Sequence, residues 1–109
     1  MKAPIFAMAA LTFASCASAY EPDPVRAEIQ AYFNSAAEPT VKDSVWTQRG
    51  IFKVGVLDNR TERDGFAAYV CEILRERGLR EPGIRVHVID IGRLVRKNEW
   101  KKLGEAACK

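Results

Sequence analysis

The feature that most constrains the fold is a strand–helix–strand pattern between residues 51 and 91. Residues 51–57 and 84–91 each alternate between two faces in the manner of a β-strand. Between them, apolar residues recur at helical spacing, at Phe66, Val70, Ile73 and Leu74. Because a crossover of this kind joins parallel strands, the pattern predicts a β-α-β unit.

The connecting helix carries sequence signals at both ends. Thr61 followed by Asp64 comes close to a capping box at the start of the helix. Gly78 is placed to end the helix in a left-handed conformation. In the first strand, Gly55 lacks a side chain, so another segment can pack closely against it.

A second helix is predicted over residues 24–36. Asp23 can accept from the free amides of the first turn, and Pro24 suits the first helical position. The apolar stripe of this helix consists of Val25, Ile29, Tyr32, Phe33 and Ala36. The opposite, polar face is expected at the surface and consists of Arg26, Glu28, Gln30 and Asn34.

Two short segments flank the predicted β-α-β unit. Residues 45–47 have strand character, and Arg49-Gly50 predicts a bend or bulge before the next strand. After residue 90, the sequence suggests a helical turn over residues 91–97, with Leu94 and Val95 pointing inward.

The last segment, residues 99–109, fits either a strand or a helix. We favour a strand that returns antiparallel to residues 84–91, because Gly104 weakens a helix by about 1 kcal/mol. The predicted architecture is therefore a small α+β domain with the element order α-β-α-β-β.

Residues 1–19 have the layout of a cleavable signal peptide. Met1-Lys2 supplies a positive charge, residues 3–14 are apolar apart from Thr12, and Ala17-Ser18-Ala19 is a small-residue cleavage sequence. Cleavage after Ala19 leaves residues 20–109 as one exported domain, which we expect to be periplasmic or secreted.

A second reading of the same leader remains open. Ala14-Ser15-Cys16 resembles the end of a bacterial lipoprotein signal, although Phe13 stands where Leu, Val or Ile is usual. In that case Cys16 would carry lipid and anchor the protein in the envelope.

Two cysteines, Cys71 and Cys108, follow the leader, and an even number in an exported domain predicts a disulfide. The bridge closes a loop of about 38 residues, which the chain-entropy relation values at about 4 kcal/mol. The sequence has no C-x-x-C pattern and a single histidine, His87, so we expect neither a metal site nor a cofactor.

Net charge gives little information about the partner. The leader contains Lys2 and no acidic residue, so the whole-chain charge of +3 leaves +2 on residues 20–109. This small excess does not predict nucleic-acid binding, which favours a strongly basic stripe.

Three carboxylates form a candidate ligand edge. Asp58 and Asp90 follow the two parallel strands, and Asp64 lies at the start of the connecting helix. Ligands of open α/β sheets favour this edge. The alternative is that these residues end a strand, complement a helix dipole and begin a turn.

A second candidate is a basic and aromatic surface near the C-terminus, formed by Arg93, Arg96, Lys97, Trp100, Lys101 and Lys102. Such a surface can meet anionic lipid or an acidic protein. The alternative is a solvated surface around a core tryptophan.

No catalytic or cofactor motif stands out in the sequence, and His87 has no nucleophile patterned near it. We therefore expect a non-enzymatic, disulfide-stabilised domain that binds another envelope or extracellular protein, for example through an exposed sheet edge. The alternatives are an enzyme or small-ligand binder that uses the strand-end carboxylates, and an envelope protein anchored through Cys16. Apart from that anchor, membrane contact is expected only through the basic C-terminal segment.

Overall fold

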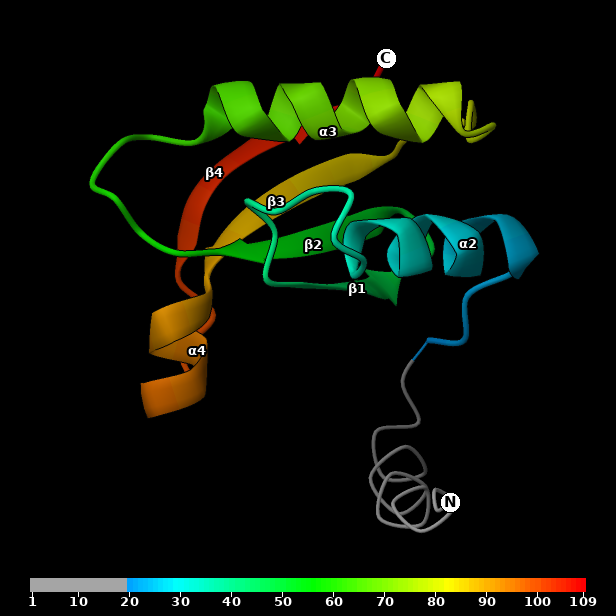
Figure 1. Ribbon diagram of the computed structural model, residues 1–109. Helices are drawn as coiled ribbons and strands as arrows, with labels where there is room; N and C mark the ends of the chain where they lie inside the picture. Colours follow the sequence, from blue (N-terminus) through cyan, green and yellow to red (C-terminus); the bar gives the residue numbers. More distant parts are fainter. Residues whose placement is uncertain (1–19) are drawn as a thin grey trace, which may run out of the picture.

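The computed structural model describes residues 20–109, so the predicted leader and the lipidation of Cys16 lie outside the described residues. The described chain is a small α+β domain (Figure 1). Its elements, in chain order, are α2 (Pro24–Phe33), β1 (Asp43–Gln48), β2 (Ile51–Val56), α3 (Asp64–Glu76), β3 (Arg85–Asp90), α4 (Ile91–Lys97) and β4 (Lys102–Ala107).

The strands form one sheet in the order β1-β2-β3-β4. The predicted β-α-β unit is confirmed, since β2 and β3 pair in parallel and α3 connects them. β1 pairs antiparallel with β2 across the turn at Arg49-Gly50, so the sheet has four strands where we expected three. The predicted C-terminal strand is also confirmed, because β4 pairs antiparallel with β3.

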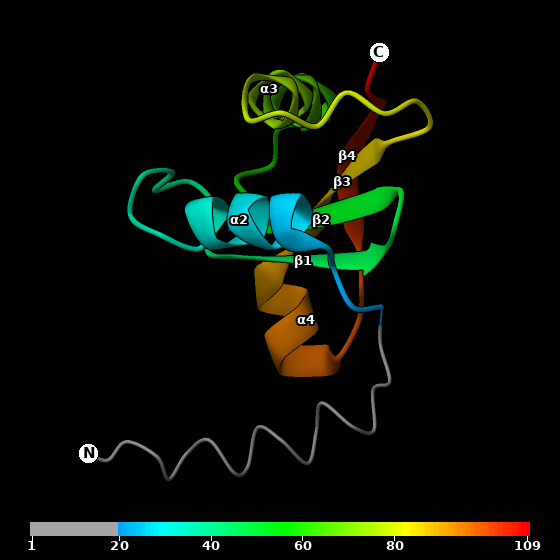
Figure 2. The ribbon, with the colours of Figure 1, turned by 90° about the vertical axis from the view of Figure 1, so that its right-hand side faces the viewer.

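The two sides of the sheet differ in what lies against them. α2 and α3 pack on one side, which we call the covered face, and α4 lies on the other side, which we call the open face (Figure 2). The core sits beneath α2 and α3, where Phe33, Trp46 and Phe52 are at most 1% exposed and their rings are in contact.

Two glycines allow close contacts across the sheet. A Cβ atom at Gly55 would lie 2.8 Å from Cδ1 of Ile91, so this glycine lets α4 pack against β2 on the open face. A Cβ atom at Gly104 would overlap the backbone of Arg63, so that glycine lets the start of α3 press against β4. The close packing predicted at Gly55 is therefore confirmed.

The disulfide predicted between Cys71 and Cys108 is confirmed, with the two Cα atoms 5.2 Å apart. It joins α3 to the residue that follows β4. The left-handed conformation predicted at Gly78 is also confirmed, with φ +100°.

The N-terminal helix differs from the prediction in two respects. It ends at Phe33 and not at residue 36, although Asp23 caps it through the amide of Arg26 as expected. Arg26 was expected at the surface, yet it is 1% exposed. Its guanidinium donates to the Arg49 carbonyl oxygen, to Asp23 and to Glu81, and these partners allow its burial.

Two further local predictions were wrong. Thr61 does not cap α3, because its hydroxyl donates to Asn59, while the Asp64 amide donates to the carboxylate of Glu62. Val95 does not point inward: it is 77% exposed, because the inward side of the short α4 is taken by Ile91 and Leu94.

Candidate functional site

The open face carries a row of side chains from all four strands. The strand register places Val45, Lys53, His87 and Glu105 side by side across the sheet. Because residues directly opposite one another share a face, the row crosses the middle of the open face. Val45 is 36% exposed, and neither α2 nor α3 covers this row.

Two cationic side chains and a histidine surround the carboxylate of Glu105 in this row. Nζ of Lys102 lies 2.9 Å from Oε1 of Glu105, and a guanidinium nitrogen of Arg85 lies 3.3 Å from it. The hydrogen bonds from Lys102 and Arg85 hold the pKa of Glu105 below its ordinary value of 4.5. Nε2 of His87 lies 3.5 Å from the same oxygen.

His87 has a lowered pKa in this setting. Burial lowers the pKa below its ordinary value of 6.5, and the charges of Lys102 and Lys53 lower it further, while Glu105 opposes them. His87 is therefore neutral at pH 7. At the imidazole, the repulsion from Lys102 and Lys53 exceeds the attraction of Glu105, and it adds to the effect of burial.

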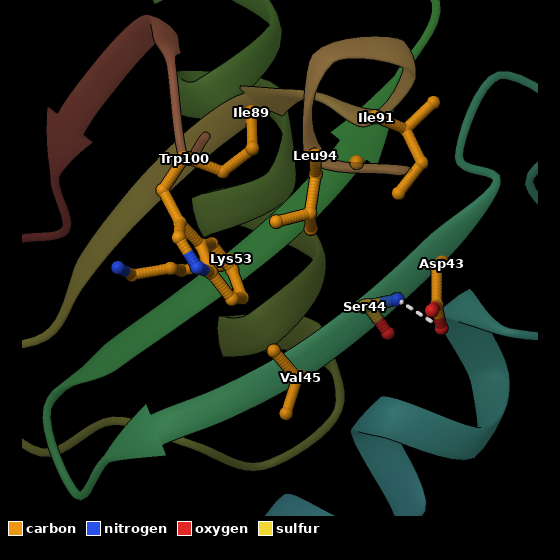
Figure 3. Close-up of a pocket in the computed structure, with 9 residues that line it drawn as sticks. Asp43, Ser44, Val45, Lys53, Ile89, Ile91, Leu94 and Trp100 are labelled. Carbon is orange, nitrogen blue, oxygen red and sulfur yellow. Dashed lines mark hydrogen bonds between the residues drawn. The ribbon is translucent and has the colours of Figure 1, made fainter. Parts of the chain in front are cut away.

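A small apolar pocket lies beside this row, between β1, β2 and α4 (Figure 3). It has a volume of about 60 Å³. Its lining is Asp43, Ser44, Val45, Lys53, Gly55, Ile89, Ile91, Leu94 and Trp100.

Trp100 and Lys53 form one side of the pocket. Nζ of Lys53 lies 5.0 Å from the centre of the Trp100 ring, within range of a cation–π interaction. Trp100 is 49% exposed, so it is not the core tryptophan of the alternative interpretation. Among residues 20–109, Lys53 forms no ion pair with an acidic side chain.

Two of the three carboxylates of the predicted ligand edge come together. Asp58 and Asp90 line a hollow of about 500 Å³ at the ends of β2 and β3, with Arg60, Arg93 and Arg96 also in its lining. Asp58 accepts from the Arg60 amide, and Asp90 caps α4 by accepting from the Arg93 amide. Each carboxylate thus holds a turn or a helix start.

Asp64 does not line that hollow. Its Oδ1 accepts from the Glu105 amide of β4 at 2.9 Å. No group of three or more potential metal ligands occurs within the part of the chain that the structure describes.

The predicted basic and aromatic surface divides into paired and unpaired cations. Arg93 pairs with Glu99 at 2.9 Å, and Lys102 pairs with Glu105. Arg96, Lys97 and Lys101 are exposed and form no ion pair within residues 20–109.

Both edges of the sheet are partly covered, which sequence analysis did not anticipate. At β1, the amide of Ser44 donates to Asp43 and the amide of Trp46 donates to Gln30. At β4, the amide of Glu105 donates to Asp64, and the Leu103 carbonyl oxygen accepts from Arg63. Side chains and a loop thus take the groups that a partner strand would need.

Sequence analysis also missed the pocket on the open face. Part of the pocket had a signal in the sequence, because Gly55 marks the place where α4 packs closely against the sheet. The pairing of Val45 with Lys53 depends on the β1–β2 register, and Trp100 reaches the pocket from a segment far away in the sequence.

Comparisons of the chain with protein-family models, with curated proteins and with solved structures find no match. No helix among residues 20–109 combines the length and the apolar character needed to span a bilayer.

Proposed function

We propose that this chain is a small exported, disulfide-stabilised, non-enzymatic domain that binds another envelope or extracellular protein through its open face. The pocket beside Val45 carries this proposal. Its volume of about 60 Å³ suits part of one side chain rather than a substrate. Its walls are largely apolar, and Val45 and Trp100 at its rim are 36% and 49% exposed.

The charges around the pocket define the chemistry of the partner. Lys53 lies in the pocket wall without an acidic partner among the described residues. The lowered pKa of His87 reports burial and uncompensated positive charge nearby. The partner that fits is a protein segment with an apolar side chain for the pocket and a neighbouring carboxylate for Lys53.

The open face is a better candidate for the protein-binding surface than the edges of the sheet. Addition of a partner strand needs free backbone amides and carbonyls, and several of these at β1 and β4 already bond to Gln30, Arg63 and Asp64. We therefore assign recognition to side chains of the open face.

Site-specific photocrosslinking tests the proposal. A photoreactive residue at Val45 should crosslink a protein in the cells that produce the chain, whereas one at Ala68, on the exposed side of α3, should not. Binding of the purified, identified protein should then weaken at least tenfold with Val45→Asp.

Val25→Asp is the matched control, since Val25 is 39% exposed and lies on α2, away from the open face. It introduces the same charge and should leave the affinity unchanged. Three results would overturn the proposal: no adduct at Val45, equal adducts at Val45 and Ala68, or equal effects of the two aspartates.

The mass of the mature protein tests export. Cleavage after Ala19 predicts Tyr20 as the first residue, while lipidation predicts a diacylated Cys16. An intact Met1 would contradict both forms of export.

A further inference from the structure

The segment from Val95 to Lys101 forms a basic protrusion, which we call the α4 tip. All seven residues of this segment are exposed. α4 has no buried residue. Its first turn packs against β2 through Ile91, and its C-terminal end points away from the sheet and from the other two helices in both views (Figures 1 and 2).

The α4 tip combines unpaired cations with exposed apolar side chains. Arg93 neutralises Glu99, which leaves Arg96, Lys97 and Lys101 without acidic partners among the described residues. Val95 and Trp100 are 77% and 49% exposed on the same short segment.

Backbone hydrogen bonds hold the tip in one shape. Asn98 adopts a left-handed conformation with φ 56°, and its amide donates to the Leu94 carbonyl at 2.9 Å, which ends the helix. The Lys101 carbonyl accepts from the Asp90 amide at 2.9 Å. Binding therefore requires little further ordering of the backbone.

We propose that the α4 tip binds anionic phospholipid headgroups, with Trp100 and Val95 entering the interfacial region of the bilayer. Tryptophan prefers this region because its ring is amphipathic, and lysine and arginine are attracted to an anionic membrane surface. The tip is thus complementary to the lipid surface in both charge and polarity.

The small size of the tip favours lipid over a folded acidic protein. A standard protein interface takes about 20–30 residues from each partner, whereas the tip is a single projecting segment of seven residues. Insertion of one aromatic and one aliphatic side chain, assisted by three cations, needs only the tip.

Vesicle binding tests this inference on the full chain with Cys16→Ser, which prevents lipidation at that position. The probes are phosphatidylcholine vesicles with and without about one third phosphatidylglycerol, at low and physiological salt. Only the anionic vesicles should bind the protein, and salt should weaken the binding.

Arg96→Glu with Lys97→Glu should reduce vesicle binding at least tenfold. The matched control is Lys42→Glu with Arg80→Glu, which makes the same change of net charge at two exposed residues outside the tip. Equal losses for the two pairs would mean that net charge alone attracts the protein, and they would overturn the assignment to the tip.

Tryptophan fluorescence gives an independent measurement. Trp46 is 1% exposed and serves as an internal reference, so a blue shift on vesicle binding should come from Trp100 and disappear in Trp100→Ala. The lipid assignment is overturned if anionic vesicles do not bind, if neutral vesicles bind equally, or if polyaspartate binds as tightly with no effect of Trp100→Ala.

The two proposals share Trp100, which lines the pocket and belongs to the α4 tip, so variants of other residues separate them. The variants at Val45 and Val25 do not alter the α4 tip, and the variants at Arg96 and Lys97 do not alter the pocket. Failure of either proposal can therefore be distinguished from failure of the other.

Discussion

On the covered face, Phe52 and Val54 of β2 are completely buried, whereas Lys53 between them lies on the open face and is partly exposed. One strand therefore contributes to two different environments. Beneath α2 and α3, aromatic and aliphatic side chains fill the core, while the other side presents Lys53, His87 and a small pocket. The comparison teaches that side-chain alternation separates the two faces of one strand: residues that stabilise the core lie on one face, and the recognition that we propose uses the other.

The largest expected difference between the two faces is in packing. Phe52→Ala should lower the free energy of unfolding by about 3–5 kcal/mol, because Phe52 is 0% exposed and contacts Trp46 and Phe33. Trp100→Ala on the open face should cost about 1 kcal/mol, since half of the ring is already in water. Urea denaturation measures both values. Similar losses would contradict the division of the sheet into two faces.

The disulfide is the second largest effect and belongs to the covered face. Cys71→Ser with Cys108→Ser should lower the free energy of unfolding by up to about 4 kcal/mol, because the open chain gains entropy when unfolded. Reduction of the wild-type protein should have the same effect in urea denaturation, and reductant should not affect the double variant. Ready alkylation of both cysteines in native, unreduced protein would show that the bond is absent.

Substitution of Arg26 should have an intermediate effect on stability, because this residue joins α2 to the β1–β2 turn and to the loop before β3. Arg26→Met should cost about 2–3 kcal/mol, because it leaves the Arg49 carbonyl without its donor and removes one of the three hydrogen bonds to Glu81. Arg49→Met should cost less, since the Arg49 side chain is 62% exposed. Equal losses in urea denaturation would show that burial of Arg26 is not what matters.

The same network gives a pH dependence. The amide and guanidinium of Arg26 outweigh desolvation and lower the pKa of Asp23. Burial raises the pKa of Glu81, but the hydrogen bonds from Arg26 and Arg49 outweigh it and leave that pKa lowered too. Both carboxylates thus stabilise the fold above their ordinary pKa values of 3.8 and 4.5, and this contribution is lost as the pH falls below them. Arg26→Met should flatten the acid side of the stability profile.

The smallest effect is expected on the open face at His87. Because its pKa lies below the ordinary value of 6.5, the unfolded chain binds a proton more readily than the folded one. Stability from this residue is therefore complete above pH 6.5 and declines as the pH falls through the folded pKa. NMR titration of the imidazole measures the pKa, and Lys53→Met should raise it by removing one repelling charge. A pKa at or above 6.5 in the wild-type protein would refute the positive potential on this face.

Elements with a strong local pattern could be predicted from sequence. The alternation of β2 and β3 and the apolar stripe of α3 defined the β-α-β unit, and Gly78 marked the end of the helix. The sequence predicted some candidate residues but not the pocket on the open face. Asp58 and Asp90 were expected at one edge of the sheet, and they line one hollow there. The pocket between Val45 and Trp100 was not predicted. Its walls depend on strand register and on the approach of α4, which no local pattern specifies.

The sequence by itself determined the β-α-β unit, the presence of the N-terminal helix and the pair of cysteines outside the predicted leader. These properties follow from hydrophobic periodicity and turn residues, which act over a few positions of the chain. Only the tertiary structure decided that Arg26 is buried, that Val95 is exposed and that the sheet edges are partly covered. The physical reason is that burial of a charge or coverage of an edge depends on partners distant in the sequence, such as Glu81 for Arg26 and Asp64 for Glu105.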